Sequence, residues 1–265
     1  IFHLMEKMNF TIDEIDKLTG PAIGRPKSAT FRTADVIGID TLVKVANFVY
    51  ASCPDDEARE LFHIPAFVQK LVENNWLGDK TKQGFFKVVK NASGKKEFHA
   101  INPATFEYAL NPKPKFAALE DLKKTDDLRE KMRIAISAND KAGDFYRAFF
   151  YGLFAYVSNR IPEISDEIYR LDDALIAGFG WELGPFETAA VLRGETIPAS
   201  TLLSKSRVVK RTDGASLRDL GDGVLCVEFH SKMNTIGGDT LDMLHAGVRE
   251  ATKNFVELVI EIGRA

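Results

Sequence analysis

Two short stretches of this 265-residue chain carry polar side chains of the types that bind or orient a substrate. The first is a loop that contains Arg25, Lys27 and Ser28. Guanidinium and ammonium groups bind anions such as phosphate, and a hydroxyl both donates and accepts hydrogen bonds, so a substrate-facing role is one interpretation. The other is structural, because Gly24 and Pro26 shape the loop and its side chains can serve the turn.

The second stretch is Asn159–Arg160, which follows a helix pattern rich in aromatic residues. A carboxamide both donates and accepts hydrogen bonds, so Asn159 can hold a carbonyl group or orient an imidazole. It can also cap or turn the chain where the helix ends. The residue types leave both roles open.

Other chemistries find little support in the spacing of residues. None of the five histidines has a partner in a metal-binding pattern, and no Ser/His/Asp or Cys/His order stands out. Gly178–Gly184 has the pattern G-x-G-x-x-x-G, one residue longer than a dinucleotide-binding motif, and follows a helix pattern, which predicts a turn between helices. The basic run Lys205–Arg211 is interpreted as a solvated linker, with a phosphate contact as the alternative. We expect no metal site, no cofactor site and no catalytic residue in this chain.

The composition is that of an ordinary globular protein. A net charge of −3 and 45% hydrophobic residues predict neither wholesale disorder nor a general affinity for nucleic acid or acidic membranes. Cys53 and Cys226 form no disulfide or metal pattern, and no signal-peptide pattern opens the sequence, which indicates a cytoplasmic protein. No apolar run approaches the about 18 residues that a membrane span needs.

An internal repeat organises the first 195 residues. The stretch Ile12–Ile39 returns in altered form at Ser165–Glu187, and in each copy an aspartate, Asp16 or Asp172, precedes a glycine by eight residues. Because the copies lie about 155 residues apart, they predict a duplicated helical domain packed as a pseudo-dimer rather than a solenoid.

The elements that position these residues are predicted to be mainly helices. Thr11–Glu14 forms a capping box, and Gly20–Pro21 ends the helix that it begins. Apolar spacing and capping residues predict further helices over about 30–37, from Asp40, from Pro54, from Pro65, around 128–135, over 141–157 and from Ser165. Two extended runs, Phe85–Val89 and Glu97–Ile101, predict a β-hairpin that lies on the helices.

The apolar period changes to two after a predicted linker at Thr196–Lys205. Strands are predicted at Ala215–Leu220 and Val224–Phe229, on either side of a glycine-containing turn. A helix capped by Asp239 and a strand over Val256–Ile262 follow. This order predicts the opening of an α/β domain.

Three stretches, Gly20–Asp40, Ser158–Ile161 and Gly178–Glu187, resemble the C-terminal helical domain of the 3-hydroxyacyl-CoA dehydrogenases. Gly223–Asp239 resembles the start of an enoyl-CoA hydratase (crotonase) domain. The order of the two resembles bacterial bifunctional β-oxidation proteins.

The resemblance implies a mainly α fold: two helical repeats like the C-terminal domain of 6-phosphogluconate dehydrogenase with a small β-hairpin, then a partial α/β crotonase-like segment. The implied bounds are 1–110 for the first repeat, 111–195 for the second, 196–214 for a linker and 215–265 for the crotonase-like segment.

The resemblance also implies a function. Members of the family oxidise (3S)-3-hydroxyacyl-CoA to 3-ketoacyl-CoA with NAD, which a Rossmann domain holds beside a catalytic His–Glu pair. The helical domain supplies dimer contacts and a wall of the acyl pocket. It also supplies an asparagine from an Asn-Arg dipeptide just before the first helix of the repeat. Asn159–Arg160 is interpreted as the counterpart of that dipeptide in the second copy, with a structural role.

Ile1 lies within a helix pattern, so we expect a fragment that lacks the Rossmann domain, binds no NAD and is inactive alone. Its expected partners are acyl-CoA, the missing N-terminal Rossmann domain and a second copy in a homodimer. The alternative is a non-catalytic helical module for interaction or oligomerisation.

Overall fold

The computed structural model describes residues 1–195, 206–230 and 235–261. The chain forms two compact units. The first comprises Ile1–Asp166 and Ala174–Thr196, and the second Glu167–Asp173 and Ile197–Ala265. The two predicted repeats, 1–110 and 111–195, thus lie mainly within the first unit, and the boundary between them near residue 110 stays a prediction.

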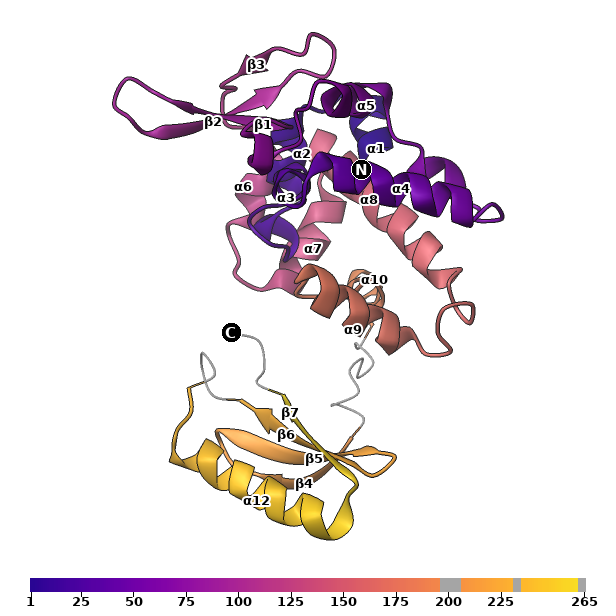
Figure 1. Cartoon of the computed structure of the whole chain (residues 1–265), viewed down its shortest axis with the longest axis vertical. Helices are drawn as coiled ribbons and strands as arrows, with labels where there is room; N and C mark the ends of the chain where they lie inside the picture. The colour runs from indigo at the N-terminus through magenta and orange to yellow at the C-terminus, as the bar shows by residue number, and fades with distance from the viewer. Residues whose placement is uncertain (196–205, 231–234, 262–265) are drawn as a thin grey trace. The chain divides into compact units, whose positions relative to one another are not determined.

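The first unit is helical, as the predicted mainly α fold requires (Figure 1). The longest of its helices is α8, in which Phe145, Tyr146 and Phe150 are buried. It packs against α1, α7 and α10, and the Tyr146 hydroxyl donates to the Leu18 carbonyl at 3.0 Å. In chain order the helices are α1 (Phe2–Lys7), α2 (Ile12–Leu18), α3 (Phe31–Ile37), α4 (Ile39–Ser52), α5 (Ala66–Glu73), α6 (Ala117–Leu122), α7 (Leu128–Ser137), α8 (Lys141–Ser158), α9 (Ile168–Phe179), whose first turns are assigned to the second unit, and α10 (Pro185–Arg193).

Helix starts agree with the sequence where a side chain caps the backbone. At α2 the Thr11 N–H donates to Glu14 Oε2 at 2.9 Å and the Glu14 N–H to Thr11 Oγ1 at 3.3 Å, so the capping box is confirmed. The cap predicted at Asp40 is wrong: Gly38 is the N-cap of α4, and the Asp40 carboxylate pairs with Lys80. The α6 helix was not predicted.

The helix predicted from Pro54 is also wrong. Its carboxylates were expected to favour a helix N-terminus, but the chain turns here and next forms a short 3-10 helix, Arg59–Phe62. The Asp56 and Glu57 carboxylates instead bind Arg160, which lies far along the sequence. Tertiary contact outweighs the local preference.

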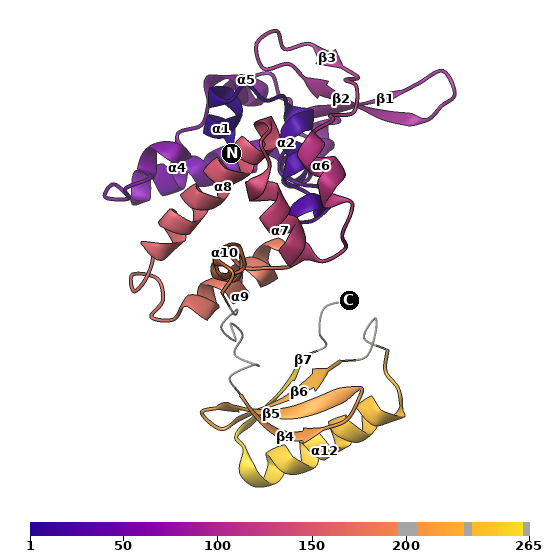
Figure 2. The ribbon, with the colours of Figure 1, turned by 180° about the vertical axis from the view of Figure 1, so that it is seen from behind.

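The predicted hairpin is confirmed, but the expectation that it lies on the helices is wrong, because it extends away from them (Figure 2). It comprises β1 (Phe86–Lys90) and β2 (Lys96–Ile101), and a short β3 (Tyr108–Ala109) completes an antiparallel sheet. Val88 lies opposite Phe98, and Lys90 opposite Lys96.

The second unit contains a four-stranded sheet and one helix. Its elements are β4 (Arg207–Arg211), β5 (Ala215–Gly221), β6 (Val224–Phe229), α12 (Gly238–Asn254) and β7 (Glu257–Glu261). Strands β4 to β6 are antiparallel, and α12 connects β6 to a parallel β7. Leu217, Leu225 and Val227 form its core with Met243 of α12. The predicted order of strand, strand, helix and strand is confirmed.

Two details of this unit were predicted wrongly. The linker expected over 196–214 and the solvated linker interpretation of the basic run fail at Arg207–Arg211, which forms β4. The N-cap of α12 is Gly237, not Asp239. Thr196–Lys205 lies outside the described residues. Among the described helices, none is long and apolar enough to cross a membrane.

Candidate functional site

The loop that carries Arg25, Lys27 and Ser28 is held at its C-terminal end by the partly buried carboxylate of Asp16. Asp16 Oδ1 accepts from the backbone N–H of Thr30 at 3.1 Å and of Phe31 at 2.6 Å, and Oδ2 accepts from Arg32 N–H at 2.9 Å. These bonds satisfy the free N–H groups at the start of α3. Burial raises the pKa of Asp16 to about 6, against the three donors that favour its ionised form.

The glycine-containing turns of the two predicted copies meet each other. Gly24 and Gly180 share the left-handed backbone conformation, with φ of +66° and +64°. The Gly24 carbonyl accepts from the Glu182 N–H at 2.9 Å. A Cβ at Gly24 would lie 2.5 Å from Leu128 Cδ2, so only glycine fits this contact.

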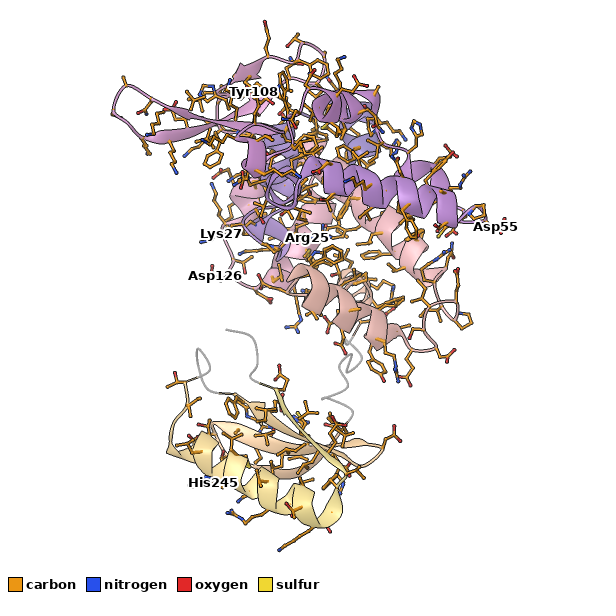
Figure 3. The ribbon with its side chains drawn as sticks, in the orientation of Figure 1. Arg25, Lys27, Asp55, Tyr108, Asp126 and His245 are labelled. Carbon is orange, nitrogen blue, oxygen red and sulfur yellow. The ribbon has the colours of Figure 1, made fainter. Side chains whose placement is uncertain are left out.

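Arg25 lies at the same junction (Figure 3). Its guanidinium carbon is 3.8 Å from the centroid of the Trp181 ring and 4.7 Å from that of Phe149. Burial lowers the pKa of Arg25 to about 9. The side chain therefore stacks on aromatic rings of α8 and of the second turn, which supports the structural interpretation.

Its neighbours have different surroundings. Lys27 is exposed and lies at the edge of the molecule in Figure 3. Ser28 Oγ accepts from Thr33 Oγ1 at 2.8 Å, within the turn that begins α3. The loop thus holds one exposed cation and no group of converging side chains that would grip a substrate.

Asn159 lies in a different cluster, at the C-terminal end of α8. Its Nδ2 donates to Glu57 Oε1 at 2.9 Å. Arg160 reaches Asp56 at 3.2 Å and Glu57 at 2.5 Å, and Tyr156 Oη donates to Asp56 Oδ2 at 2.8 Å. The cluster ties α8 to the turn after α4.

The interpretation of Asn159–Arg160 as the second-copy counterpart of an Asn-Arg dipeptide upstream of Ile1 stays a prediction, with these contacts as the structural role of the pair. The pair follows α8 and precedes α9, the helix that carries Asp172 of the second copy.

Asp35 has a carboxylate bound to the backbone of a distant segment, and the sequence did not single it out. Its Oδ1 and Oδ2 each accept at 2.8 Å, from the N–H groups of Phe85 and Phe86. Burial raises its pKa to about 7. A Cβ at Gly78 or Gly84 would collide with Asp35, so both glycines are required by this close approach. The sequence shows the Gly-Phe-Phe motif at 84–86, but it gives no sign that Asp35 is the partner of this motif.

The first unit has an apolar cavity of about 460 Å³ between α1, the 3-10 helix and α8. Its size and chemistry suit an apolar ligand group. His3, Lys7 and Tyr156 add polar groups to walls made mainly by Leu4, Leu61, Phe62, Phe149 and Leu153.

Two further arrangements can be judged chemically. Gly178–Gly184 joins α9 to α10, so it has no strand before it, as predicted for a turn between helices. In the second unit Ser216 Oγ lies 3.0 Å from His230 Nε2, and Glu228 Oε2 lies 3.0 Å from the same nitrogen. A relay requires the carboxylate on the other ring nitrogen, so this cluster is no catalytic triad. No metal-type group of His, Cys, Asp or Glu occurs in the described part of the chain.

Comparison with known proteins gives a consistent answer. Residues 1–88 match the family model of the 3-hydroxyacyl-CoA dehydrogenase C-terminal domain. A probable 3-hydroxyacyl-CoA dehydrogenase of Bacillus subtilis is 35% identical over 97% of this chain and 38% of its own length. A second, of Deinococcus radiodurans, is 43% identical over 36% of this chain and 26% of its own length.

A putative fatty acid oxidation complex trifunctional enzyme of Rickettsia prowazekii is 24% identical over 73% of this chain and 26% of its own length. The relatives are therefore 3-hydroxyacyl-CoA dehydrogenases or fatty acid oxidation enzymes. The chain spans about two fifths of the Bacillus relative and about a quarter of the other two.

Proposed function

We propose that this chain, whose residues 1–88 match the C-terminal domain of 3-hydroxyacyl-CoA dehydrogenase, forms the helical part of such an enzyme. The reaction is the oxidation of (3S)-3-hydroxyacyl-CoA to 3-ketoacyl-CoA with NAD. The observation that carries the proposal is the 35% identity to the Bacillus dehydrogenase over 97% of the chain.

In this proposal the chain supplies the substrate side of the enzyme. The cavity between α1 and α8 serves as an apolar wall for the acyl group, because its lining is aliphatic and aromatic. The Gly178–Gly184 turn does not fit NAD, since it joins two helices and has no strand before it. A Rossmann domain with its His–Glu pair carries out the hydride transfer. In this proposal the whole enzyme is cytoplasmic and forms a homodimer.

The duplication is part of the proposal. The shared backbone conformation of Gly24 and Gly180 and the hydrogen bond between their turns support two copies packed as a pseudo-dimer. Under this view Arg25, Ser28 and Asn159 are structural, and Lys27 is the residue free to face a substrate. The β5–β6–α12–β7 order supports a crotonase-like segment, and hence a bifunctional dehydrogenase and hydratase.

The first test is NADH oxidation with acetoacetyl-CoA. The chain alone is expected to be silent, and activity is expected when a nucleotide-binding domain of a 3-hydroxyacyl-CoA dehydrogenase is joined to it. Turnover by the chain alone would overturn this division of labour. Silence of the joined protein would favour the non-catalytic module.

The acyl wall has its own test in the joined protein. Leu153→Ser removes apolar surface from the cavity, so kcat/KM for a long-chain substrate is expected to fall about tenfold, and for acetoacetyl-CoA much less. Tyr151→Ser is the control, since Tyr151 lies on the same helix but is exposed. Equal losses in both variants would remove the cavity from the proposal.

One observation favours the interaction module. Val45 and Phe48 of α4 are 56% and 71% exposed and share one helix face. Apolar side chains in such a position are typical of a contact surface. Sedimentation of Phe48→Ser beside the parent chain tests this: a shift from dimer to monomer supports the module, and identical behaviour opposes it.

A further inference from the structure

The β1–β2 hairpin carries an amphipathic face that contacts the helices at Phe98, over whose ring Arg32 lies. The face consists of Val88, Lys90, Lys96 and Phe98, which the register places as two cross-strand pairs. Val88 is 39% and Phe98 44% exposed, and both lysines are exposed. Figures 1 and 2 show the hairpin standing clear of the helices, so this face is open.

Lys90 and Lys96 form an unfavourable cross-strand pair of like charges. Like charges directly opposite each other on neighbouring strands destabilise a sheet. The nearest strand carboxylate does not offset them, because Glu97 accepts from Asn91 at 2.8 Å and lies 3.6 Å from His99. Lys95 in the adjoining turn adds a third positive charge. Local rules fail without internal compensation mainly at functional sites, and the charge of this one favours an anionic partner.

The apolar pair restricts the kind of anion. Phe98 lies between the lysine pair and Arg32, whose guanidinium carbon is 5.4 Å from the Phe98 ring centroid. Arg32 itself is neutralised by Asp79 at 2.7 Å, so the charge is concentrated at the hairpin tip. Small anionic ligands prefer concave sites, whereas this ribbon is convex. An aromatic and an aliphatic side chain beside lysines match the interface of an anionic bilayer, where the rings enter the acyl boundary and the ammonium groups stay at the phosphates.

We propose that the Val88, Lys90, Lys96 and Phe98 face docks this protein reversibly on anionic phospholipid surfaces. The contact is peripheral and independent of the proposed dehydrogenase function. Each lysine near an anionic surface strengthens partitioning about fivefold. Burial of Phe98 adds about another tenfold.

The test is co-sedimentation of the full chain with vesicles of phosphatidylcholine alone and vesicles containing about a third phosphatidylglycerol. Binding is expected only to the anionic vesicles and is expected to weaken as salt is raised. Lys90→Gln/Lys96→Gln is expected to weaken it about 25-fold, and Phe98→Ser about tenfold.

The matched control is Lys123→Gln/Lys124→Gln, which removes the same charge at exposed lysines beyond α6. It is expected to bind nearly as well as the parent chain. Circular dichroism of each variant verifies that the fold is kept. No binding to anionic vesicles, or equal loss in the control and hairpin variants, would overturn the proposal.

Discussion

The role of a single side chain in this protein depends more on its immediate surroundings than on its chemical type. Arg25 and Lys27 are both cations in one loop, yet Arg25 stacks on Trp181 and Phe149 while Lys27 is exposed. A charge-based sequence argument treats them alike. The structure assigns packing to the first and leaves only the second available to solvent.

Replacing Arg25 therefore affects stability. Arg25→Ala is expected to lower the free energy of unfolding by about 2 kcal/mol, because it removes two ring contacts and buried side-chain carbons. Lys27→Ala in the same loop should change it by less than about 0.5 kcal/mol. Urea unfolding followed by circular dichroism measures both, and equal effects would contradict the stacking role.

Asp35 gives a pH dependence with a definite sign. Its pKa is about 7 in the folded protein and near 3.8 when unfolded, so the folded state holds a proton that the unfolded state has released. This group's contribution to stability is full below about pH 4, declines as the pH rises towards 7 and is gone at pH 8.

The measurement is the free energy of unfolding at pH 5 and pH 8 for the parent chain and for Asp35→Asn. The parent should be more stable at pH 5, by an amount that the variant lacks. Asp40→Asn is the control, because Lys80 lowers the pKa of Asp40 and its stabilising effect changes only at more acidic pH. A parent and an Asp35→Asn variant with the same pH profile would refute the assignment.

At the scale of elements, the joints between helices depend on positions where only glycine fits. The turn at Gly24 packs on Leu128 of α7 and on Glu182. The approach of Gly78 and Gly84 to Asp35 likewise lets the strand after α5 begin against α3. These joints, rather than helix propensity, set how the helices of the first unit meet.

Gly24→Ala is expected to destabilise the first unit by about 3 kcal/mol, because alanine is strained at positive φ and its Cβ would overlap Leu128. Gly178→Ala is the control: it lies in α9 with open space around it, so alanine should stabilise slightly. Thermal unfolding of both variants provides the comparison. A tolerated Gly24→Ala would show that the turn can rearrange.

At the scale of the whole molecule, each unit has a hydrophobic core of its own. Leu225 is fully buried in the second unit, beside Leu217, Val227 and Met243. Leu225→Ala is expected to cost about 3 kcal/mol there and to leave the helical unit unchanged. Calorimetry should then show one of two transitions moving down in temperature. A single transition that moves as a whole would mean that the units unfold together.

Local patterns alone predicted most of the elements. The capping box at Thr11, the apolar stripe of α8, the hairpin and the strand order of the second unit all depend on neighbours within a few residues, so periodicity and capping chemistry reveal them. The resemblance of the first copy to a dehydrogenase domain was likewise carried by a continuous stretch and was confirmed there.

What only the tertiary structure decided depends on contacts between distant residues. Asp35 binds a loop 50 residues away, Arg160 binds the acidic turn that had predicted a helix, and Arg25 lies on rings from another helix and turn. No local pattern contains these partners. Burial then changes the chemistry, because removing water raises the pKa of Asp35 and lowers that of Arg25. The sequence determined which helices and strands form; the packing of distant segments determined which side chains remain free to act.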